Sequence, residues 1–454
     1  MCQSLVNKNN IPGPRYTSYP TVPYWDNETF SLGEYKNTVR QSYIESNRSE
    51  GLSVYIHLPY CESLCTFCGC NKRITKRHEV ELPYINTLLK EWDLYLKFFA
   101  TKPRIKELHL GGGTPTFFSP ENLEYLIKGI LRTATLADDF EFSFEGHPGN
   151  TTKLHLQTLY DLGFRRVSFG VQDYNEKVQN AIHRTQTFEQ VQQVTQLARE
   201  IGYTSVGHDI IFGLPFQTQE DVRHTILKTK ELMPDRLAFY SYAHVPWQKG
   251  NGQRGFKDSD LPAPADKRAQ YELGKALLAS VGYVEVGMDH FALVTDALYQ
   301  SMENKSLHRN FMGYTASKTQ LMVGLGVSAI GDSWYGFAQN VKGIEEYKHL
   351  VNEQILPVFR GHLLTEVDES VRQHILDLMC RMQTRWDEGT LKIQNLDEVL
   401  ERLAPLQNDG LLELDTEGIT ILEKGKPFVR NICMAFDLRL QAHQPKTQLF
   451  SMTV

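Results

Sequence analysis

The chain has 454 residues, of which 41% are hydrophobic and 22% charged, so it has the length of about three domains and can bury a core. Its 48 basic and 54 acidic residues give a net charge of −6, which argues against sequence-independent binding to nucleic acid. It contains no run of about 18 apolar residues that would span a membrane, and its first residues lack the apolar core of a signal peptide. We therefore expect a cytoplasmic protein that binds neither nucleic acid nor membrane.

Residues 1–50 are polar and rich in turns, with prolines at positions 12, 14, 20 and 23. Proline fixes its own φ and restricts the residue before it, so the stretch from Pro12 to Pro20 cannot be helical throughout. We predict an N-terminal arm here. It is either a plain surface segment or a cover over the active site that does not hold the fold.

From residue 51 onward, short apolar runs alternate with longer amphipathic stretches. The apolar runs lie at 53–58, 105–110, 140–145, 165–171, 205–212 and 235–242. Strands that alternate with helices predict an α/β fold with a parallel sheet, either a partial (β/α)6-type barrel or an open doubly wound sheet. Polar or glycine-rich segments follow the runs, and the carboxyl ends of parallel strands meet at one rim, so we expect the active site there.

The alternation ends near residue 245. We predict a barrel core over 51–250, an extension of the barrel over 251–360 and a mainly helical C-terminal domain over 361–454. The last region contains two stretches with helical periodicity, followed by a hairpin pattern at 411–422. This order is typical of winged-helix units. Because the chain lacks a basic surface, structural packing is a better interpretation of this unit than DNA binding.

Four of the seven cysteines fall within residues 61–70, which indicates a metal or redox site rather than disulfides. Cys61, Cys65 and Cys68 have the spacing C-x3-C-x2-C directly after the first apolar run. Three thiolates leave one iron of a four-iron cluster open to a small molecule. Cys70 is too near Cys68 in the chain for an easy fourth ligand. Zinc is the alternative, although a closed zinc site needs a second knuckle or histidines at fixed spacing.

The segment CESLCTFCGC resembles the cluster motif of radical S-adenosylmethionine (SAM) enzymes, which also have a GGGTP-like segment after the second strand. More narrowly, the chain resembles the oxygen-independent coproporphyrinogen III dehydrogenase family almost from end to end. The matching segments, in order, are PGPRYTSYP, YIHLPYCESLCTFCGCN, LHLGGGTPTF, SFGVQD, FGLPFQT, GMDHFA, LHRNFMGYT, GLGVSAI and FVRNICMAFD.

This resemblance implies a radical SAM oxidoreductase of haem (porphyrin) biosynthesis. Such an enzyme converts two propionates of coproporphyrinogen III to vinyl groups and so makes protoporphyrinogen IX. An electron from the reduced [4Fe-4S] cluster cleaves SAM to methionine and a 5′-deoxyadenosyl radical, and the protein positions these cofactors. The resemblance also implies two SAM molecules, a reduced donor such as flavodoxin or ferredoxin, and a monomer. The alternatives are a radical SAM methyltransferase acting on a tetrapyrrole and a non-catalytic haem chaperone.

The family's binding residues map onto matching positions of this chain, and no catalytic residue is implied beyond the cluster and SAM. Glu145 ends the third run, where a carboxylate can accept from an ammonium or hydroxyl group. Taken singly, these residues have plainer explanations, such as loop packing for Phe67 or a salt bridge for Glu145. The implied ligands of the cluster are Cys61, Cys65 and Cys68. The implied SAM residues are Tyr55, Gly112 and Ile330 for the first molecule and Phe67, Gly113, Thr114, Gln172, Arg184, Asp209 and Ala243 for the second.

Carboxylates on the implied substrate require basic partners. The candidates are Arg15, Arg309, Lys72, Arg73, Lys76 and Arg77, although the 72–77 run also suits a solvated face. The chain departs from the family pattern at two places, with Gly146-His147-Pro148 where Val-Asp-Pro is expected, and with Gly207-His208 before Asp209. We predict that His147 only shapes the turn before Pro148.

Overall fold

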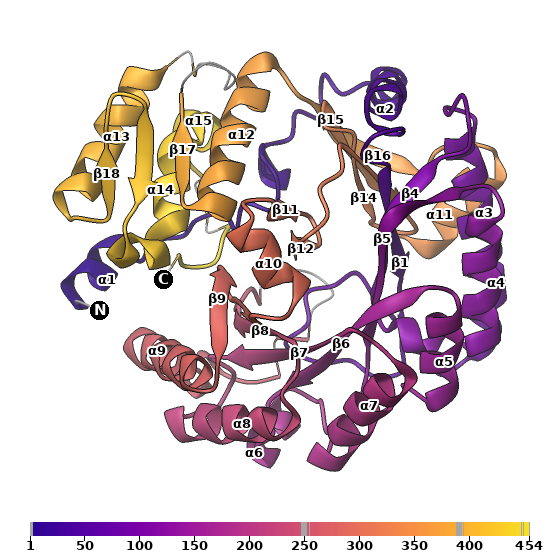
Figure 1. Ribbon diagram of the computed structural model, residues 1–454, viewed down its shortest axis with the longest axis horizontal. Helices are drawn as coiled ribbons and strands as arrows, with labels where there is room; N and C mark the ends of the chain where they lie inside the picture. The colour runs from indigo at the N-terminus through magenta and orange to yellow at the C-terminus, as the bar shows by residue number, and fades with distance from the viewer. Residues whose placement is uncertain are drawn as a thin grey trace.

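The structure is a computed structural model that describes residues 3–246, 252–253, 255–386, 393, 395–445, 447 and 449–453. Its centre is a twelve-stranded sheet with the strand order β16-β15-β14-β13-β1-β4-β5-β6-β7-β8-β10-β9. Figure 1 shows this sheet curving through the middle of the molecule, with a separate group of C-terminal elements beside one of its ends.

The six predicted strands are consecutive and parallel in this sheet. They are β1 (Leu52–Leu58), β4 (Arg104–Gly112), β5 (Thr135–Gly146), β6 (Phe164–Gln172), β7 (Ser205–Phe212) and β8 (Arg236–Ser241). A doubly wound sheet would reverse its strand order at a switch point. No reversal occurs among these six strands, so the structure confirms the partial barrel and excludes the open alternative.

Short strands extend the sheet on both sides of the six. Beyond β1 lie β13 (Leu321–Leu325), which is parallel to β1, and then β14 (Ile330–Asp332), β15 (Gly336–Asn340) and β16 (Val358–Leu363), which are antiparallel to their neighbours. Beyond β8 lie β10 (His290–Leu293) and β9 (Tyr283–Gly287), both in antiparallel pairs. Two two-stranded sheets complete this part: β2 (Tyr60–Cys61) with β3 (Arg73–Ile74), and β11 (His308–Asn310) with β12 (Gly313–Thr315).

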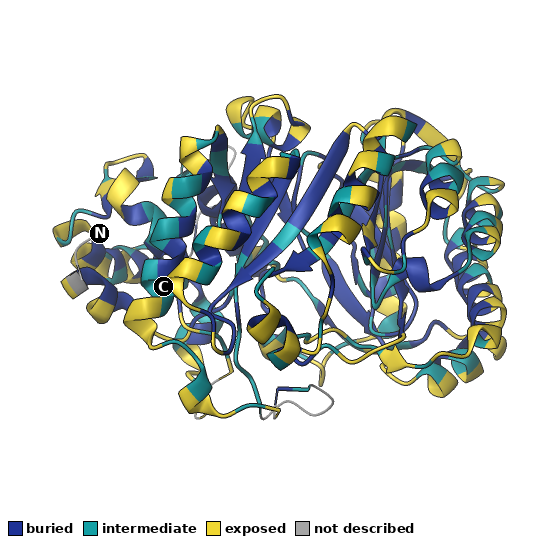
Figure 2. Cartoon of the chain, turned by 90° about the horizontal axis from the view of Figure 1, so that it is seen from below, coloured by how far each residue is buried: buried dark blue, intermediate teal, exposed yellow. Residues whose placement is uncertain are grey.

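Helices cover the outer face of the barrel, and Figure 2 shows their exposed sides turned away from a buried sheet. They are α3 (Glu81–Leu96), α4 (Pro120–Leu131), α5 (Lys153–Asp161), α6 (Glu176–Ala181), α7 (Phe188–Ile201), α8 (Gln219–Leu232), α9 (Pro264–Ser280) and α11 (Ile344–Asn352). The short helix α10 (Ala297–Glu303) instead contributes Leu298 to the core of the C-terminal unit. None of the helices in the described part of the chain combines the length and the apolar character that crossing a membrane requires.

Apolar and polar side chains alternate along the strands. The apolar ones form a layer of the core, and the polar ones point into the barrel. In β4, Leu108 and Leu110 are fully buried among the core residues, whereas His109 contacts Ser143 of β5 inside the barrel. Each buried Leu contributes about 1.5–3 kcal/mol to stability. Successive side chains of a strand point to opposite faces, so the same strands that build the core also deliver polar groups to the site.

The C-terminal unit contains α12 (Glu366–Arg381), α13 (Leu396–Asn408), α14 (Val429–Phe436) and α15 (Leu438–Ala442). A three-stranded sheet joins them, with β17 (Gln383–Arg385), β19 (Gly418–Ile421) and β18 (Leu412–Leu414) in that order. The predicted hairpin is confirmed, because β18 and β19 pair antiparallel within 411–422.

Residues 1–50 are part of two cores. Helix α1 (Gln3–Asn9) contributes Leu5 and Val6 to the core of the C-terminal unit, and Tyr16 and Tyr19 lie in the same core. Helix α2 (Leu32–Ser46) instead supplies Tyr35, Val39 and Tyr43 to the main core. The expectation that this arm holds none of the fold is therefore wrong. The boundaries at 50, 250 and 360 remain predictions, and the one at 250 lies outside the described residues.

Candidate active site at the rim of the barrel

A cavity of about 440 Å³ opens at the carboxyl ends of the parallel strands. It is lined by most of the residues that the sequence predicts to bind cofactors, and these come from five strands and the loops that follow them. The predicted residues in its lining are Cys61, Cys65, Phe67, Cys68, Gly112, Gly113, Thr114, Glu145, Gln172, Arg184 and Asp209. The strand-end geometry thus brings together side chains that are far apart in the sequence.

The other three predicted residues lie next to this lining rather than in it. Tyr55 lies beside Glu145, since both side chains come within 3.2 Å of the point that a Cβ on Gly111 would occupy. The carbonyl of Ala243 accepts from Gln253 Nε2 at 3.0 Å, and the same nitrogen donates to the carbonyl of Phe67 at 3.3 Å.

Ile330 starts β14 on the far side of β13. Its carbonyl oxygen lies 2.5 Å from the point that a Cβ on Gly324 would occupy, and Gly324 is the β13 partner of Tyr55. Ile330 therefore belongs to the same end of the barrel as Tyr55.

Groups on and beside the cysteine loop stabilise its thiolates. Thr114 Oγ1 donates to Cys61 Sγ at 3.3 Å, and Arg184 Nη1 donates to Cys65 Sγ at 3.8 Å. A hydrogen bond from the Cys70 thiol lowers the pKa of Cys68 to about 6. Burial raises the pKa of Cys61 to about 11, so this thiol gives up its proton only when a metal replaces it.

Cys61, Cys65 and Cys68 share one cavity, as the ligands of a cluster must. Among the described residues, no group of three Cys, His, Asp or Glu side chains is arranged to hold a single metal ion. In a four-iron cluster each thiolate binds a different iron, so the sulfurs lie farther apart than ligands that share one ion. Cys61, Cys65 and Cys68 in one cavity therefore suit a [4Fe-4S] cluster with one open iron.

Two glycines at the end of β4 give the cavity its depth. Gly112 has φ = +109°, and a Cβ there would lie 2.6 Å from the ring of His57. A Cβ on Gly113 would lie 2.7 Å from the backbone of Pro59. Only glycine fits at both places, so the backbone can approach a ligand closely here.

Glu145 and Asp209 place two carboxyl groups in the cavity with different charge states. Loss of water inside the barrel raises the pKa of Glu145, but His109, whose Nε2 lies 3.5 Å from Glu145 Oε1, and the Gly112 N–H bring it below its usual range. Burial and the charge of Glu145 raise the pKa of Asp209 to about 7, and Ser168 Oγ donates to Asp209 at 3.0 Å. The cavity thus offers one fixed anion to a cationic ligand.

Arg184 is held at the rim and is not a solvated helix residue. Its Nη2 donates to the carbonyl of Gly170 at 2.8 Å, and its Nε donates to Gln186 Oε1 at 3.2 Å. Gln172 adopts a left-handed φ of 66° at the end of β6, close to Gly170. Both residues are oriented by the strand end before any ligand binds.

The two departures from the family pattern differ in position. His147 lines the cavity, and its Nδ1 accepts from the Gly149 N–H at 3.0 Å, as the turn prediction requires. Burial and the nearby Arg184 lower the pKa of His147 to about 3, so the ring is neutral. His208 points away from the cavity and shares a hydrogen bond with Thr195 of α7 at 2.9 Å.

The predicted basic residues do not gather at one place. Lys72 and Lys76 line the cluster cavity, Arg77 is exposed and pairs with Glu79, and Arg15 lines a different cavity. The sequence interpretation also missed His57 and His109. The sequence contained a signal for both histidines. Each is a polar residue between apolar residues of a strand, and this pattern places it inside the barrel.

Comparison with known proteins agrees with this geometry. The radical SAM superfamily profile matches residues 55–228. A curated protein of Helicobacter pylori named oxygen-independent coproporphyrinogen III oxidase is 38% identical over 436 residues, which cover 95% of both chains. The protein of the same name from Escherichia coli is 38% identical over 458 residues, which cover 99% of this chain and 98% of that one. A solved structure of coproporphyrinogen III oxidase from Escherichia coli, described as a radical SAM enzyme, superposes with a TM-score of 0.89 at 36% identity, covering 96% of this chain and 98% of that one.

The fold and the cysteine cavity therefore define a radical SAM oxidoreductase, an enzyme that uses a [4Fe-4S] cluster and SAM. Within that class, the identity over nearly the whole length decides the family. The chain belongs to the oxygen-independent coproporphyrinogen III oxidases.

Proposed function

We propose that this enzyme decarboxylates two propionates of coproporphyrinogen III to vinyl groups, giving protoporphyrinogen IX in haem biosynthesis. The observation that carries the proposal is the rim cavity. It joins the cysteine triad, the glycine turn and two carboxyl groups in a chain that is similar over almost its full length to proteins named for this substrate.

Each reacting propionate loses a hydrogen atom from the carbon next to the ring, which the 5′-deoxyadenosyl radical would take up. It also loses one CO₂ and one electron, which a one-electron acceptor would take up, and a carbon–carbon double bond forms. When bound, the cluster and SAM supply the radical that abstracts the hydrogen. Cys61, Cys65 and Cys68 hold the cluster, while Glu145 accepts hydrogen bonds from the ammonium group of SAM. His109 keeps Glu145 ionised, so this acceptor is present throughout the neutral pH range.

We further propose that two SAM molecules are bound and cleaved. Tyr55, Gly112 and Ile330 belong to the first site. The opposite wall, with Gln172, Arg184 and Asp209, supplies a cation and a carboxyl group of its own, and this supports a second site. Phe67, Gly113, Thr114 and Ala243 belong to that second site. A reduced donor such as flavodoxin or ferredoxin delivers the electron, and the chain works as a monomer.

The test is anaerobic incubation of the reduced holoenzyme with SAM and coproporphyrinogen III, followed by mass spectrometry. We expect a product that has lost two carboxyl groups, together with two methionines per product molecule. Added methyl groups would identify a tetrapyrrole methyltransferase instead. No turnover together with tight haem binding would identify a haem chaperone.

A further inference from the structure

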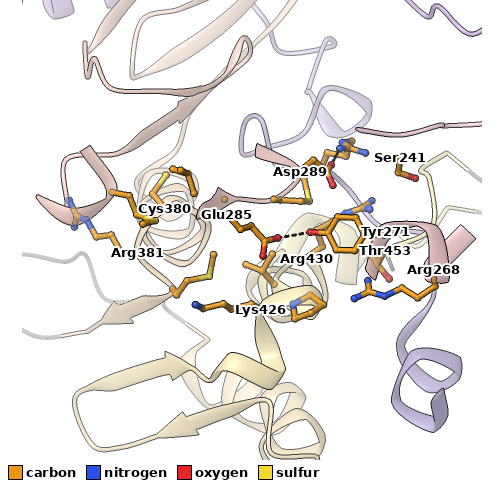
Figure 3. Close-up of a pocket in the computed structure, with 18 of the residues that line it drawn as sticks. Ser241, Arg268, Tyr271, Glu285, Asp289, Cys380, Arg381, Lys426, Arg430 and Thr453 are labelled. Atoms are coloured by element: carbon orange, nitrogen blue, oxygen red, sulfur yellow. Dashed lines mark hydrogen bonds and ion pairs between the residues drawn. The ribbon is translucent and has the colours of Figure 1, made fainter. Parts of the chain in front are cut away.

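A second cavity, of about 360 Å³, lies between the last strands of the barrel and the C-terminal unit (Figure 3). Distant parts of the chain meet in its lining. These are Arg15 from the N-terminal segment, α9, the β9–β10 turn, the end of α12, the start of α14, and Met452 with Thr453. A space of this size between two packed units calls for an explanation, because interiors are otherwise close-packed.

Positive charge dominates this cavity, although the whole chain is acidic. Its acidic residues are Glu285, Asp289 and Glu303, and its basic residues are Arg15, Lys267, Arg268, Lys305, Arg381, Lys426 and Arg430. The lining therefore carries 7 − 3 = +4 in a chain of net charge −6. Concentrated positive charge in a recess attracts an anionic ligand.

Two of the acidic groups already have partners. Glu285 accepts from the Tyr271 hydroxyl at 2.5 Å and pairs with Lys275, which does not line the cavity. Asp289 pairs with Arg15. Arg15 is thus neutralised, and Arg381 and Lys426 pair with Asp377 and Glu423, which do not line the cavity. The remaining cations of the lining are Lys267, Arg268, Lys305 and Arg430.

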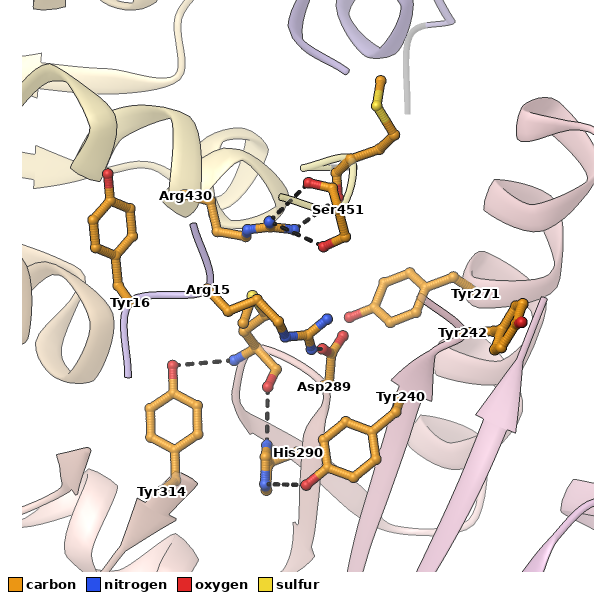
Figure 4. Close-up of polar contacts among 12 residues, drawn as sticks. Arg15, Tyr16, Tyr240, Tyr242, Tyr271, Asp289, His290, Tyr314, Arg430 and Ser451 are labelled. Atoms are coloured by element: carbon orange, nitrogen blue, oxygen red, sulfur yellow. Dashed lines mark hydrogen bonds and ion pairs between the residues drawn. The ribbon is translucent and has the colours of Figure 1, made fainter. Parts of the chain in front are cut away.

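Arg430 has a structural role. Its guanidinium donates to the backbone carbonyls of Gly13, Pro14, Ser451 and Met452, as Figure 4 shows in part. These bonds tie the N-terminal segment to residues 451–452 and use the donors that face them. A ligand in the cavity must therefore be held by other groups.

Lys267 and Arg268 are those groups. Lys267 Nζ donates to the carbonyl of Tyr242 at 2.7 Å, and no carboxylate of the described residues forms an ion pair with it. Arg268 pairs with Glu272, but its Nε is buried without a hydrogen-bond partner. Burial and the nearby Arg15 lower the pKa of Lys267 to about 8, so a bound anion would relieve an unfavourable charge. A buried unpaired donor is costly unless a ligand satisfies it.

The cavity flanks the same loop as the cluster cavity. Ser241, the last residue of β8, lines the second cavity, and Ala243 follows two residues later. Ala243 is linked through Gln253 to Phe67, which lines the first cavity. Inside the barrel, Tyr240 and His290 share a hydrogen bond of 3.3 Å beside Asp289 (Figure 4). The two cavities are therefore built on the same loop after β8.

We propose that this second cavity binds the propionate carboxylates that the enzyme leaves intact, with Lys267 and Arg268 as their partners. The inference rests on the proposed function, in which two of four propionates react and two remain. Apolar side chains of Phe212, Val286, Met288 and Met382 line the same space and suit the tetrapyrrole edge that carries these groups. The basic cavity thus decides which tetrapyrroles are accepted by recognising their carboxylates.

The experiment compares the holoenzyme with its Lys267→Ala and Arg268→Ala variants. The first measurement is the Kd for coproporphyrin III and for its tetramethyl ester, which has the same ring but no charge. The second is KM and kcat with coproporphyrinogen III. Lys230→Ala is the control, because it removes one positive charge from an exposed position of α8. Lys267→Arg should restore binding of the free acid.

We expect each cavity variant to raise the Kd of coproporphyrin III about tenfold, the effect of losing one charge-assisted hydrogen bond. Binding of the ester should stay as in the wild type. KM should rise in parallel, while iron content and substrate-free SAM cleavage stay unchanged.

Three outcomes would overturn the inference. An unchanged Kd for the free acid would exclude the two basic residues from binding. A raised Kd with an unchanged KM would assign the cavity to a separate effector rather than to the substrate. If the wild type does not convert coproporphyrinogen III at all, the proposed function itself is wrong and this assignment is wrong with it. Conversion by the wild type together with unaffected variants would instead leave the function intact.

Discussion

The two cavities of the molecule differ in how they are built. The cluster cavity is formed by successive ends of one parallel sheet, and its groups are thiols, glycines and two carboxyls. The basic cavity is formed by segments from both ends of the chain, and its groups are cations. Sheet register fixes the first, whereas packing between units fixes the second. A substitution that damages one cavity should therefore leave ligand binding at the other cavity measurable. Five predictions use this difference.

The largest effect should come from the cysteines. Replacing Cys61, Cys65 or Cys68 by Ala should remove the cluster and all SAM cleavage, because a methyl group cannot bind iron. Coproporphyrin III should still bind at the basic cavity. Iron content and absorbance report the first effect, and a porphyrin titration reports the second. Cys70→Ala is the matched variant and should keep its iron. If it lacks iron while one of the other three retains it, the ligand assignment is wrong.

The second largest effect should be on the free energy of unfolding, when Arg430 beside the basic cavity is replaced. Arg430→Met should lower the free energy of unfolding by roughly 3–5 kcal/mol, because several buried carbonyls lose their donor. Urea unfolding measures this change, with Arg223→Met on the exposed side of α8 as the control. Equal stability of the two variants would show that Arg430 does not join the N-terminal segment to the C-terminal unit.

Glu145→Gln should weaken SAM binding about tenfold to a hundredfold, the effect of removing a charged acceptor, worth ~1.5–3 kcal/mol. Equilibrium dialysis with SAM measures it on the iron-loaded enzyme, and Glu124→Gln on α4 is the control. The basic cavity should keep its affinity for coproporphyrin III. A SAM affinity within threefold of the wild type would remove Glu145 from the site.

Asp209 should make stability depend on pH. Its pKa is about 7 in the folded chain against 3.8 as the ordinary value, so the folded state binds more protons between these values. Stability due to this group is therefore fully present below about pH 4 and falls as the pH rises towards 7. Solvent screening limits the loss to the order of 1 kcal/mol. Thermal melts of wild type and Asp209→Asn across this range should diverge; parallel curves would contradict the raised pKa.

The smallest effect should be that of His147→Asp. The wild-type ring is neutral and accepts from the Gly149 N–H, and an Asp side chain can accept the same bond. Affinities for SAM and coproporphyrinogen III should change less than threefold. His147→Ala, which loses the acceptor, should cost only about 0.5–1.5 kcal/mol of stability. A tenfold loss of either ligand in both variants would make His147 a binding residue.

The sequence predicts the barrel well because its signals are local. The alternation of short apolar runs with longer amphipathic stretches located all six parallel strands, although β5 begins at Thr135 rather than at residue 140. The short strands β13 to β16 were not predicted, because three to six residues carry too little periodicity to distinguish a strand from a loop. The cavity residues could be assigned because they lie in segments that resemble the family's motifs, and most of these segments follow a predicted strand.

The packing of residues 1–50 could not be predicted in this way. Leu5 and Tyr16 are buried only because α12 and α14, more than 350 residues later, cover them. The sequence around them is polar and broken by prolines, which indicates a surface segment when no partner is visible. The basic cavity has the same origin, since Lys267 and Arg430 have no motif that relates them.

The link between the N-terminal segment and the C-terminal unit also sets an order of events during synthesis. Residues 12–14 leave the ribosome long before their partners, Arg430 and Met452. At about 5–20 residues per second, the segment waits roughly 20–90 s for them. During that interval Leu5, Val6, Tyr16 and Tyr19 have no core to enter, so the nascent chain exposes apolar side chains that a chaperone can bind. The basic cavity is completed only when residues 452–453 dock, so carboxylate recognition is acquired after the barrel strands are in place.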